Sequence, residues 1–311
     1  MPDHRRLDAR AAEQAARAAL RSDPATAPLA EAGFRAVPGG LSNFAWHVSD
    51  RGGECFVRYA RGDGERLGAD HAAECRVLDL TARHGLSPPI VRCDPAARLL
   101  VTCWIDATHV GRPMRSPAAV TLVARVLATL HGLPVPGDLR PVRFDEQARV
   151  LEAAFEPGPA GLAMRSSARE VFATLGAAAT PPVLCHHDLN PLNLLVDGDG
   201  RVWLVDWEYA GLGDAAIDLA SFACQHGLGA SQRAQLVEAY RQAGGTLEAE
   251  RFDLARWAFD YVQWAWYRAV LARPDPGVDA AVVRGRATRL AAALQRRASR
   301  LLRCNNAGFA N

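Results

Sequence analysis

Between residues 184 and 208, side chains able to do chemistry gather within a short stretch of the sequence. His186, His187 and Asp188 directly follow an apolar run, and Asn193 and Asp206 come later in the same stretch. A carboxylate can accept or orient the proton of an attacking hydroxyl group. Amide and carboxylate oxygens are hard ligands that suit Mg²⁺, which a protein typically holds together with phosphate oxygens. The residue types therefore predict a site that binds Mg²⁺ together with phosphate oxygens.

The elements around these residues predict how they meet. Two apolar runs flank an Asp-Gly-Asp-Gly turn at 197–200, which is a strong hairpin signal. Since a strand advances about 3.3 Å per residue, the return strand brings Asp206 back beside Asn193. An acid at the end of a buried strand is costly unless it is paired or bound to a metal. We therefore expect Asn193, Asp206 and Asp188, on the loop that feeds the hairpin, to converge on one Mg²⁺.

Taken singly, these residues also have ordinary explanations. Asp188 or Asn190 alone fits a turn or a helix cap, and a lone histidine such as His186 is more often a hydrogen-bonded core residue than a catalyst. The combination of the residues in this order favours a functional site.

The chain around this stretch divides into a β-rich part and a helical part. Residues 1–30 predict a helix and a loop, 31–106 a small sheet with one helix, 107–303 a mostly helical part, and 304–311 a tail. Such an organisation predicts an α+β fold with a cleft between two lobes. The expected strands are 45–48, 55–59 and 99–104, and the expected helices are 7–20, 69–84, 117–131, 144–155, 168–175, 215–226, 232–243, 254–271 and 279–302.

Composition excludes several classes of protein. A chain of 311 residues with 49% hydrophobic and 23% charged residues is long enough for two globular lobes. The net charge of +2 gives no reason to expect a nucleic-acid or membrane partner, and the apolar stretches are too short to span a bilayer. A cytoplasmic location is expected because the N-terminus has no apolar signal segment. The seven cysteines are scattered without a CxxC pair, which predicts reduced thiols rather than a disulfide framework or a zinc site.

The pattern His186-x-Asp188-x4-Asn193, followed by Asp206, resembles the catalytic loop and metal-binding aspartate of the protein-kinase-like fold. In the form seen here, with Asp-Trp-Glu-Tyr-Ala-Gly at 206–211, it resembles the aminoglycoside phosphotransferase and choline kinase superfamily over about residues 30–270. The segment 205–214 is most similar to bacterial thiamine kinases and choline kinases. The resemblance implies a bilobal α+β kinase fold, with a small β-rich N-lobe containing one main helix and a larger, mostly helical C-lobe. It also implies ATP and Mg²⁺ as cofactors.

The resemblance assigns a role to each residue of the motif. Asp188 would accept or orient the proton of the attacking hydroxyl, and His186 belongs to the same catalytic motif. Asn193 and Asp206 would hold Mg²⁺ on the nucleotide phosphates. Glu208 would aid a second metal ion or the substrate, with an exposed loop acid as the alternative.

Two further aspartates receive structural roles. Asp214 is expected to cap the helix that follows it. Asp218 is expected to steady the catalytic loop by accepting backbone hydrogen bonds.

The small lobe supplies the expected nucleotide-binding residues. Arg58 stands where protein kinases have a phosphate-binding lysine, which is consistent with a chain that contains no lysine, and Glu74 is its expected partner. A glycine-rich segment would cover the nucleotide, although a Gly-Gly turn also fits an ordinary hairpin. The remaining expected contacts are Gly39, Gly40, Ser42 and Asn43 of this loop and, from the strand that leads to the hinge, Thr102, Cys103 and Trp104 near the adenine.

Two features bear on the phosphate acceptor. Residues 224–311 contain thirteen arginines against seven acids, and such a surface would repel polycationic aminoglycosides. Trp257, Tyr261 and Trp264 share one helix face, which fits a cage for a cation as well as an ordinary core stripe. Together with the resemblance of 206–211 to thiamine and choline kinases, these features favour a small cationic alcohol, with thiamine first and choline or ethanolamine second.

Other functions stay open on the sequence alone. A kinase for sugars, homoserine or aminoglycosides would use the same chemistry. A metal-dependent hydrolase using His186, His187 and Asp188 would need no nucleotide, and an inactive regulator would bind ATP without turnover. The sequence predicts neither the oligomeric state nor a role for the arginine-rich C-terminal helix and tail.

Overall fold

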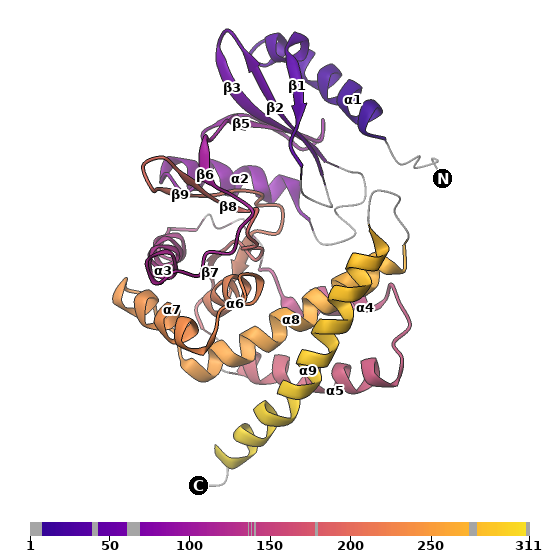
Figure 1. The fold of residues 1–311 in the computed structure, drawn as a ribbon, viewed down its shortest axis with the longest axis vertical. Coiled ribbons are helices and arrows are strands. Elements are labelled where there is room, and N and C mark those ends of the chain that lie inside the picture. Colours follow the sequence, from indigo (N-terminus) through magenta and orange to yellow (C-terminus); the bar gives the residue numbers. More distant parts are fainter. Residues whose placement is uncertain are drawn as a thin grey trace. The chain divides into compact units, whose positions relative to one another are not determined.

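The computed structural model describes residues 8–38, 43–60, 69–135, 137, 139, 141–177, 180–273 and 279–308, with side chains as far as Ala298 in the last helix. The chain forms two compact units, which Figure 1 shows as ribbons. The N-terminal unit consists of residues 1–112 and 190–210, and the helical unit of residues 113–189 and 211–311. The chain therefore leaves the helical unit after Leu189 and returns to it after Ala210.

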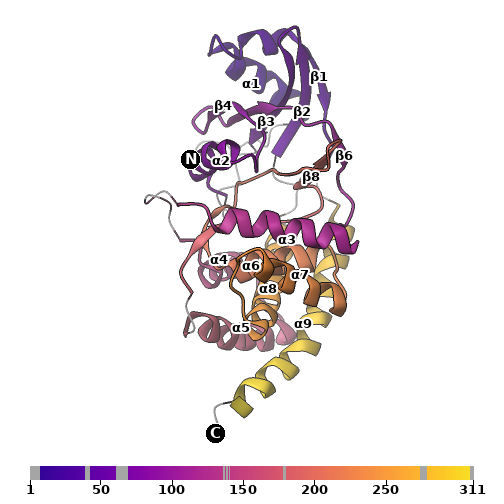
Figure 2. The same cartoon turned by 90° about the vertical axis from the view of Figure 1, so that its left-hand side faces the viewer.

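The N-terminal unit is built on a five-stranded antiparallel sheet (Figure 2). Its central strands carry mostly buried residues, as expected for a sheet covered on both faces. In spatial order the strands are β1 (Gly33–Ala36), β2 (Asn43–Asp50), β3 (Gly53–Ala60), β5 (Leu99–Cys103) and β4 (Ile90–Asp94).

Helices α1 (Ala9–Arg21) and α2 (His71–Arg83) contact opposite faces of this sheet. Val57 of β3 belongs to the buried core that also contains residues of α1, whereas its neighbour Arg58 bonds to Glu74 of α2. This arrangement follows from the alternation of side chains along a strand. The N-terminal helix is therefore an integral layer of the unit, and a short 3-10 helix at Ala27–Glu31 connects it to the sheet.

The predicted hairpin is confirmed. Strands β8 (Leu194–Asp197) and β9 (Val202–Leu204) pair antiparallel, and the Val205 amide donates to the Asn193 carbonyl at 3.1 Å. Strand β6 (Ala107–His109) adds to β8 and completes a three-stranded sheet. Because of this pairing the hairpin belongs to the N-terminal unit, which differs from the predicted division that assigned all residues after 106 to the helical part.

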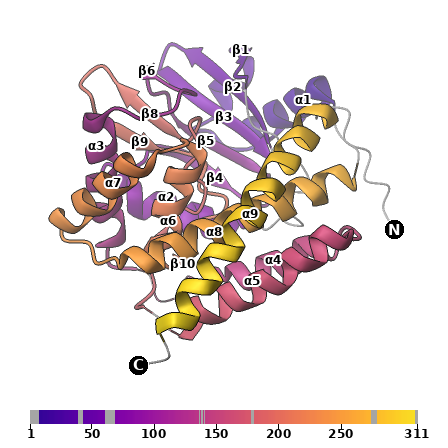
Figure 3. The same ribbon diagram turned by 60° about the horizontal axis from the view of Figure 1, so that its bottom comes forward.

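The helical unit is organised around one buried helix, α8 (Ala249–Leu271), which packs against α4, α6 and α9 (Figure 3). Most of the residues of α8 are buried on several faces, as expected for a central helix. Strands β7 (Val183–Cys185) and β10 (Gly211–Gly213) pair in a two-stranded sheet. In the sequence, β7 lies before residues 190–210, which belong to the N-terminal unit, and β10 lies directly after them. The other helices are α3 (Pro117–His131), α4 (Phe144–Glu152), α5 (Pro159–Ala177), α6 (Ala215–Gln225), α7 (Ala230–Gln242) and α9 (Ala280–Gly308).

The largest error in the helix predictions concerns α5, which begins at Pro159 rather than at residue 168. Proline and glycine at 157–161 resemble a loop, but proline is compatible with the first turn of a helix. Gly161 also has a packing role, because a side chain there would lie 2.9 Å from the Pro157 Cβ atom. No helix among the described residues is long and apolar enough to cross a membrane.

The prediction that all cysteines are reduced thiols is wrong for one pair. Cys75 of α2 and Cys93 of β4 form a disulfide, with their Cα atoms 5.7 Å apart. The two residues meet because α2 packs beside β4, a tertiary contact that cysteine spacing does not reveal. The other cysteines with described side chains, Cys55, Cys103, Cys185 and Cys224, are free thiols.

Candidate active site

Arg58 is the centre of a buried ionic cluster in the N-terminal unit. Its Nη1 atom donates to Glu74 at 2.7 Å and to Asp206 at 2.8 Å, and its Nη2 atom pairs with the second oxygen of Glu74. The predicted Arg58–Glu74 ion pair is thus confirmed. Burial by itself would lower the pKa of the guanidinium, but Glu74 and Asp206 raise it above its usual range. Arg58 is therefore a fixed positive charge that links β3, α2 and the end of the hairpin.

Glu74 is fully buried and remains ionised. Burial tends to raise the pKa of its carboxyl group, but Arg58 and His71 together hold that pKa at about 2. Glu74 lies in the first turn of helix α2. Asp70 is the N-cap of this helix, and its side chain accepts a hydrogen bond from the Ala73 amide. The capped helix end thus places a permanent negative charge under the sheet.

Asp206 has a backbone conformation that few residues adopt. Its φ angle is 65°, in the left-handed region that short polar side chains tolerate better than bulky ones. Such conformations concentrate at functional sites, where the surrounding structure enforces them. The left-handed turn comes directly after the hairpin and places the Asp206 carboxylate against Arg58.

The alternative that Glu208 is an exposed loop acid is wrong. Its side chain is buried, and the residue is 1% exposed. One oxygen accepts a hydrogen bond from the Asn43 amide group at 2.9 Å, whereas the other has no hydrogen-bond partner within the described chain. Burial and then repulsion by Asp206 raise the pKa of Glu208 to about 7.

The residues of this cluster fit a magnesium ion. Glu74, Asp206 and Glu208 place three carboxyl groups around the guanidinium of Arg58. Asn193 is buried at the base of the same hairpin. Hard oxygen donors and an excess of negative charge suit a divalent cation, and a buried carboxylate oxygen without a hydrogen bond is costly unless a ligand satisfies it.

Asp218 binds the backbone of the catalytic loop in the helical unit. Its two carboxylate oxygens accept the backbone amides of His186 at 2.8 Å and His187 at 2.7 Å, which confirms the predicted structural role. Burial tends to raise the pKa of Asp218, but the hydrogen bond from His131 and the nearby histidines hold it at about 2. The predicted cap is also confirmed, because the Asp214 side chain accepts the Ala216 amide at 2.9 Å.

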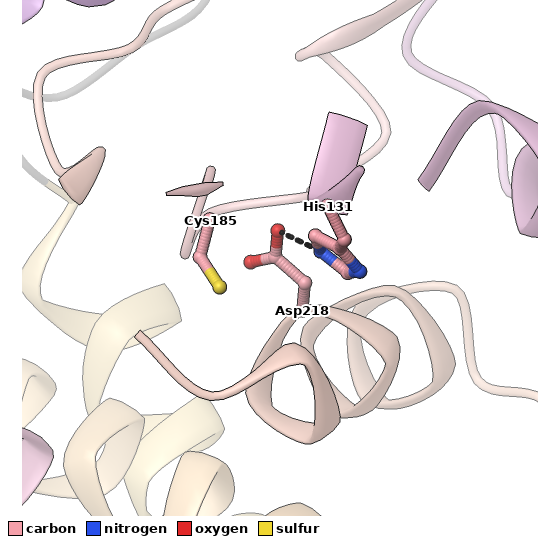
Figure 4. A group of neighbouring side chains, drawn as sticks. All are labelled: His131, Cys185 and Asp218. Atoms are coloured by element: carbon pink, nitrogen blue, oxygen red, sulfur yellow. Dashed lines mark hydrogen bonds and ion pairs between the residues drawn. The ribbon is translucent and has the colours of Figure 1, made fainter. Parts of the chain in front are cut away.

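His131 and Cys185 lie beside Asp218, as Figure 4 shows. His131 Nε2 is 3.2 Å from the Asp218 carboxylate, and its Nδ1 atom is 2.8 Å from the Tyr240 hydroxyl. Burial, followed by the charges of Asp218 and Asp214, raises the pKa of Cys185 well above its usual range, so the thiol is neutral. Because the Asp218 carboxylate accepts the amides of His186 and His187 and a hydrogen bond from His131, this group supports the loop.

Asp188 itself is positioned by helix α6. The Gln225 side-chain amide donates to the Asp188 carboxylate at 2.7 Å, and the Ser221 hydroxyl accepts the Leu189 amide at 2.9 Å. His186 is fully buried, and its Nδ1 atom accepts the Asp188 amide at 3.3 Å. His186 therefore shapes the backbone that carries Asp188.

His187 has a left-handed backbone that depends on a glycine. Its φ angle is 66°, and a Cβ atom on Gly213 would lie 2.4 Å from its Nε2 atom. Gly213 belongs to β10, so the small strand pair leaves room for the unusual loop conformation.

The sequence interpretation missed His131, Ser221 and Gln225. Ser221 and Gln225 are one helical turn apart in a mostly apolar helix that also contains Asp218, and that polar pair was the available signal. His131 ends α3 and gave no signal of its own, because its partner Asp218 lies far away in the sequence.

The predicted nucleotide contacts are described only in part. Gly39, Gly40 and Ser42 lie outside the described residues, and Asn43 begins β2. In the hinge segment, the Cys103 amide donates to the Pro89 carbonyl and the Trp104 amide to the Glu54 carbonyl, both at 2.9 Å. These two donors are thus used within the protein. Contacts of Thr102, Cys103 and Trp104 with adenine stay a prediction.

The aromatic residues predicted to form a cation cage are buried in the helical unit. Trp257 and Tyr261 stack with ring centroids 5.4 Å apart, the Trp257 indole donates to the Leu294 carbonyl, and the Tyr261 hydroxyl bonds to Glu152. These contacts join α8 to α9 and α4. Trp264 borders a cavity. Substrate binding by these three residues stays a prediction.

The structure thus brings Arg58, Glu74, Asp206 and Glu208 together in the N-terminal unit, with Asn193 on the same hairpin. Asp188 and His186 belong to the helical unit. Convergence of Asp188 with Asn193 and Asp206 on one metal ion stays a prediction.

Comparison of the chain with known proteins identifies a matching family. The model of the phosphotransferase enzyme family (APH) matches residues 33–259. Mouse ethanolamine kinase 2 is 26% identical over 195 residues, and rat choline/ethanolamine kinase is 27% identical over 216 residues. These matches cover 58% and 61% of this chain but only 50% and 53% of the relatives' lengths.

A solved structure agrees over a longer region. The choline/ethanolamine kinase family protein of Mesorhizobium loti has a TM-score of 0.72 and 26% sequence identity, covering 93% of this chain and 97% of that one. This likeness extends the agreement to nearly the whole chain and supports the predicted α+β fold of the protein-kinase-like type. With most of its residues matched by the family model, the chain belongs to the phosphotransferase enzyme family.

Proposed function

We propose that this protein transfers a phosphoryl group from ATP to the hydroxyl group of a small molecule. The observation that carries the proposal is the buried Arg58 held between Glu74 and Asp206, beside a hairpin that bears Asn193. A fixed guanidinium is suited to bind phosphate oxygens, and the neighbouring acids are suited to bind a metal ion. Asn193 and Asp206 would hold Mg²⁺, which supplies neutralisation of phosphate charge when bound.

The chain's own residues divide the remaining work. Arg58 would bind and orient the nucleotide phosphates, because its two acidic partners prevent the side chain from rotating away. Asp188 would accept the proton of the acceptor hydroxyl, with Gln225 fixing the direction of its carboxylate. Asp218 and His131 would keep the loop rigid, so that little reorganisation accompanies the reaction.

For the acceptor, the comparisons favour choline or ethanolamine over thiamine, which the sequence placed first. The mouse relative is named as an ethanolamine kinase and the rat relative as a choline/ethanolamine kinase. We therefore place choline and ethanolamine first among the acceptors to be tested, and thiamine second.

The test is coupled ADP release with Mg²⁺-ATP across choline, ethanolamine, thiamine, homoserine, sugars and kanamycin. Asp188→Asn and Asp206→Asn are each expected to lower turnover about 1,000-fold or more, as loss of a base or of charge stabilisation does. Asp199→Asn, in the exposed hairpin turn, is the matched control and should keep normal turnover.

Nucleotide binding separates the two roles. Asp188→Asn should bind Mg²⁺-ATP like the wild type, whereas Asp206→Asn should bind it more weakly, and titration calorimetry measures both. Normal turnover in either variant would overturn the assignment. Hydrolysis of substrates without any nucleotide would instead support the hydrolase alternative.

A further inference from the structure

A cavity of about 440 Å³ lies in the helical unit among α5, α8, α9 and the segment before α5. Its walls are mainly apolar, and small residues of α5 and α9 leave the space open. The walls include the aromatic rings of Phe155 and Trp264, the side chain of Met164, and the alanines at 287 and 291. Gly161 contributes because a Cβ atom there would crowd Pro157 and approach Trp264 to 3.5 Å.

The polar part of this cavity is positively charged. Arg268 and Arg284 both border it, and no Asp or Glu is among its lining residues. Within the described part of the chain, no carboxylate lies at ion-pair distance from either arginine. The Arg268 guanidinium lies over the Phe155 ring at 5.2 Å from its centroid, within the limit of about 6 Å for a cation–π contact, and its Nη2 atom donates to the Glu156 carbonyl at 3.5 Å. The positive charge is therefore available to a ligand.

The cavity is separate from the catalytic loop of the same unit. The His187 ring contacts Phe144, with centroids 5.4 Å apart, and Phe144 approaches Phe259 of α8 at 6.4 Å. Trp264 lies further along α8, by about 7.5 Å at the helical rise of about 1.5 Å per residue. A ligand beside Trp264 and Phe155 is thus connected to the loop through α4 and α8 without touching Asp188.

We infer that this cavity binds an amphipathic monoanion, an apolar body that carries one carboxylate or similar group. The apolar walls would cover the body, and the two guanidinium groups would pair with the anionic head. A cation would meet two like charges without a compensating acid. A nucleotide would leave most of its polar atoms without partners against these walls. The site goes beyond the proposed phosphotransfer and uses none of the residues assigned to it under that proposal. It replaces the cation-binding role predicted for Trp264.

Titration calorimetry with three probes of equal chain length tests the inference. Octanoate should bind saturably at one site, because its carboxylate can form an ion pair with arginine. Octanamide should bind at least about tenfold more weakly, because its carbonyl can accept only a hydrogen bond without the opposite charge, and octyltrimethylammonium should not bind measurably, because its charge is repelled. Equal binding of all three probes, or no binding of octanoate, would overturn the inference. Tighter binding of the quaternary ammonium would also overturn it and would favour the cation-binding role predicted for Trp264.

Variants locate the site. Arg268→Gln combined with Arg284→Gln should raise the Kd for octanoate at least about tenfold, while Arg286→Gln, at an exposed position outside the lining, should change it less than about twofold. Thr288→Phe, at an exposed lining position, should fill the cavity and abolish binding without loss of fold, as circular dichroism would verify. Unchanged octanoate affinity in both the double variant and Thr288→Phe would place the binding elsewhere and refute the site.

Discussion

The ionic cluster of the N-terminal unit and the catalytic loop of the helical unit differ in how their buried carboxyl groups are hydrogen-bonded. Around Arg58, three carboxyl groups crowd one guanidinium, and Glu208 keeps a buried oxygen without a hydrogen bond in the described chain. Around Asp218, each carboxylate oxygen accepts a backbone amide, and His131 adds a third hydrogen bond. The pKa values reflect this difference, at about 7 for Glu208 and about 2 for Asp218.

This contrast indicates that the ionic cluster requires a ligand, whereas the catalytic loop does not. The Asp218 carboxylate makes all three of these hydrogen bonds within the helical unit, so its contribution is rigidity of the loop before substrate binds. The ionic cluster carries more negative than positive charge, so an added cation would lower its energy. We therefore expect the loop to respond to mutation and the cluster to respond to both mutation and metal.

The largest effect should come from removing the central cation. Arg58→Met removes the guanidinium partner of the buried Glu74 and leaves it with His71 alone of the two partners described above, which should lower the free energy of unfolding by about 3–5 kcal/mol. Urea denaturation measures this loss. Arg51→Met, at an exposed turn position, is the control and should change stability by less than about 0.5 kcal/mol. A wild-type midpoint for Arg58→Met would show that the cluster is not held by this charge.

A smaller effect is expected at Asp218. Its pKa lies below the ordinary value of 3.8, at about 2, so ionisation stabilises the fold by about 2 kcal/mol at neutral pH. Asp218→Asn should lose about this amount at pH 7, measured by urea denaturation.

The pH dependence at Asp218 has a definite sign. For a carboxyl group with a lowered pKa, the stabilisation is present above pH 3.8 and is lost as the pH falls toward 2. The gap between wild type and Asp218→Asn should therefore narrow by about 1 kcal/mol between pH 7 and pH 3. A gap that stays constant over this range would mean that Asp218 acts through shape alone.

The smallest effect on stability should come from Gln225. Gln225→Ala removes one partly buried hydrogen bond to Asp188, which should cost about 1 kcal/mol or less of stability. If the amide directs the catalytic carboxylate, turnover should fall about tenfold with little change in KM. Gln242→Ala, which removes an exposed hydrogen bond to Glu238, is the matched control. Equal kinetics in the two variants would exclude a positioning role for Gln225.

Several local features of this protein could be predicted from residues that are close together in the chain. The Asp-Gly-Asp-Gly turn specifies the β8–β9 hairpin and therefore the return of the chain to Asn193. Asp214 specifies the start of α6. The first and last residues of α3 follow from Pro117 and Gly132. These features depend on residues close together in the sequence, where turn chemistry and capping dominate. The order of the residues in the catalytic motif could also be recognised because they lie close together in the sequence.

The environments of these residues depend on tertiary contacts and could not be predicted from the sequence. The burial of Glu208, the pairing of His131 with Asp218, the Cys75–Cys93 disulfide and the contact of Gln225 with Asp188 all join segments far apart in the chain. A residue's charge state and partners depend on what packs against it, and single-sequence periodicity reports only which face is apolar. Residue types could therefore be predicted as chemical groups, while their pKa values and neighbours required the fold.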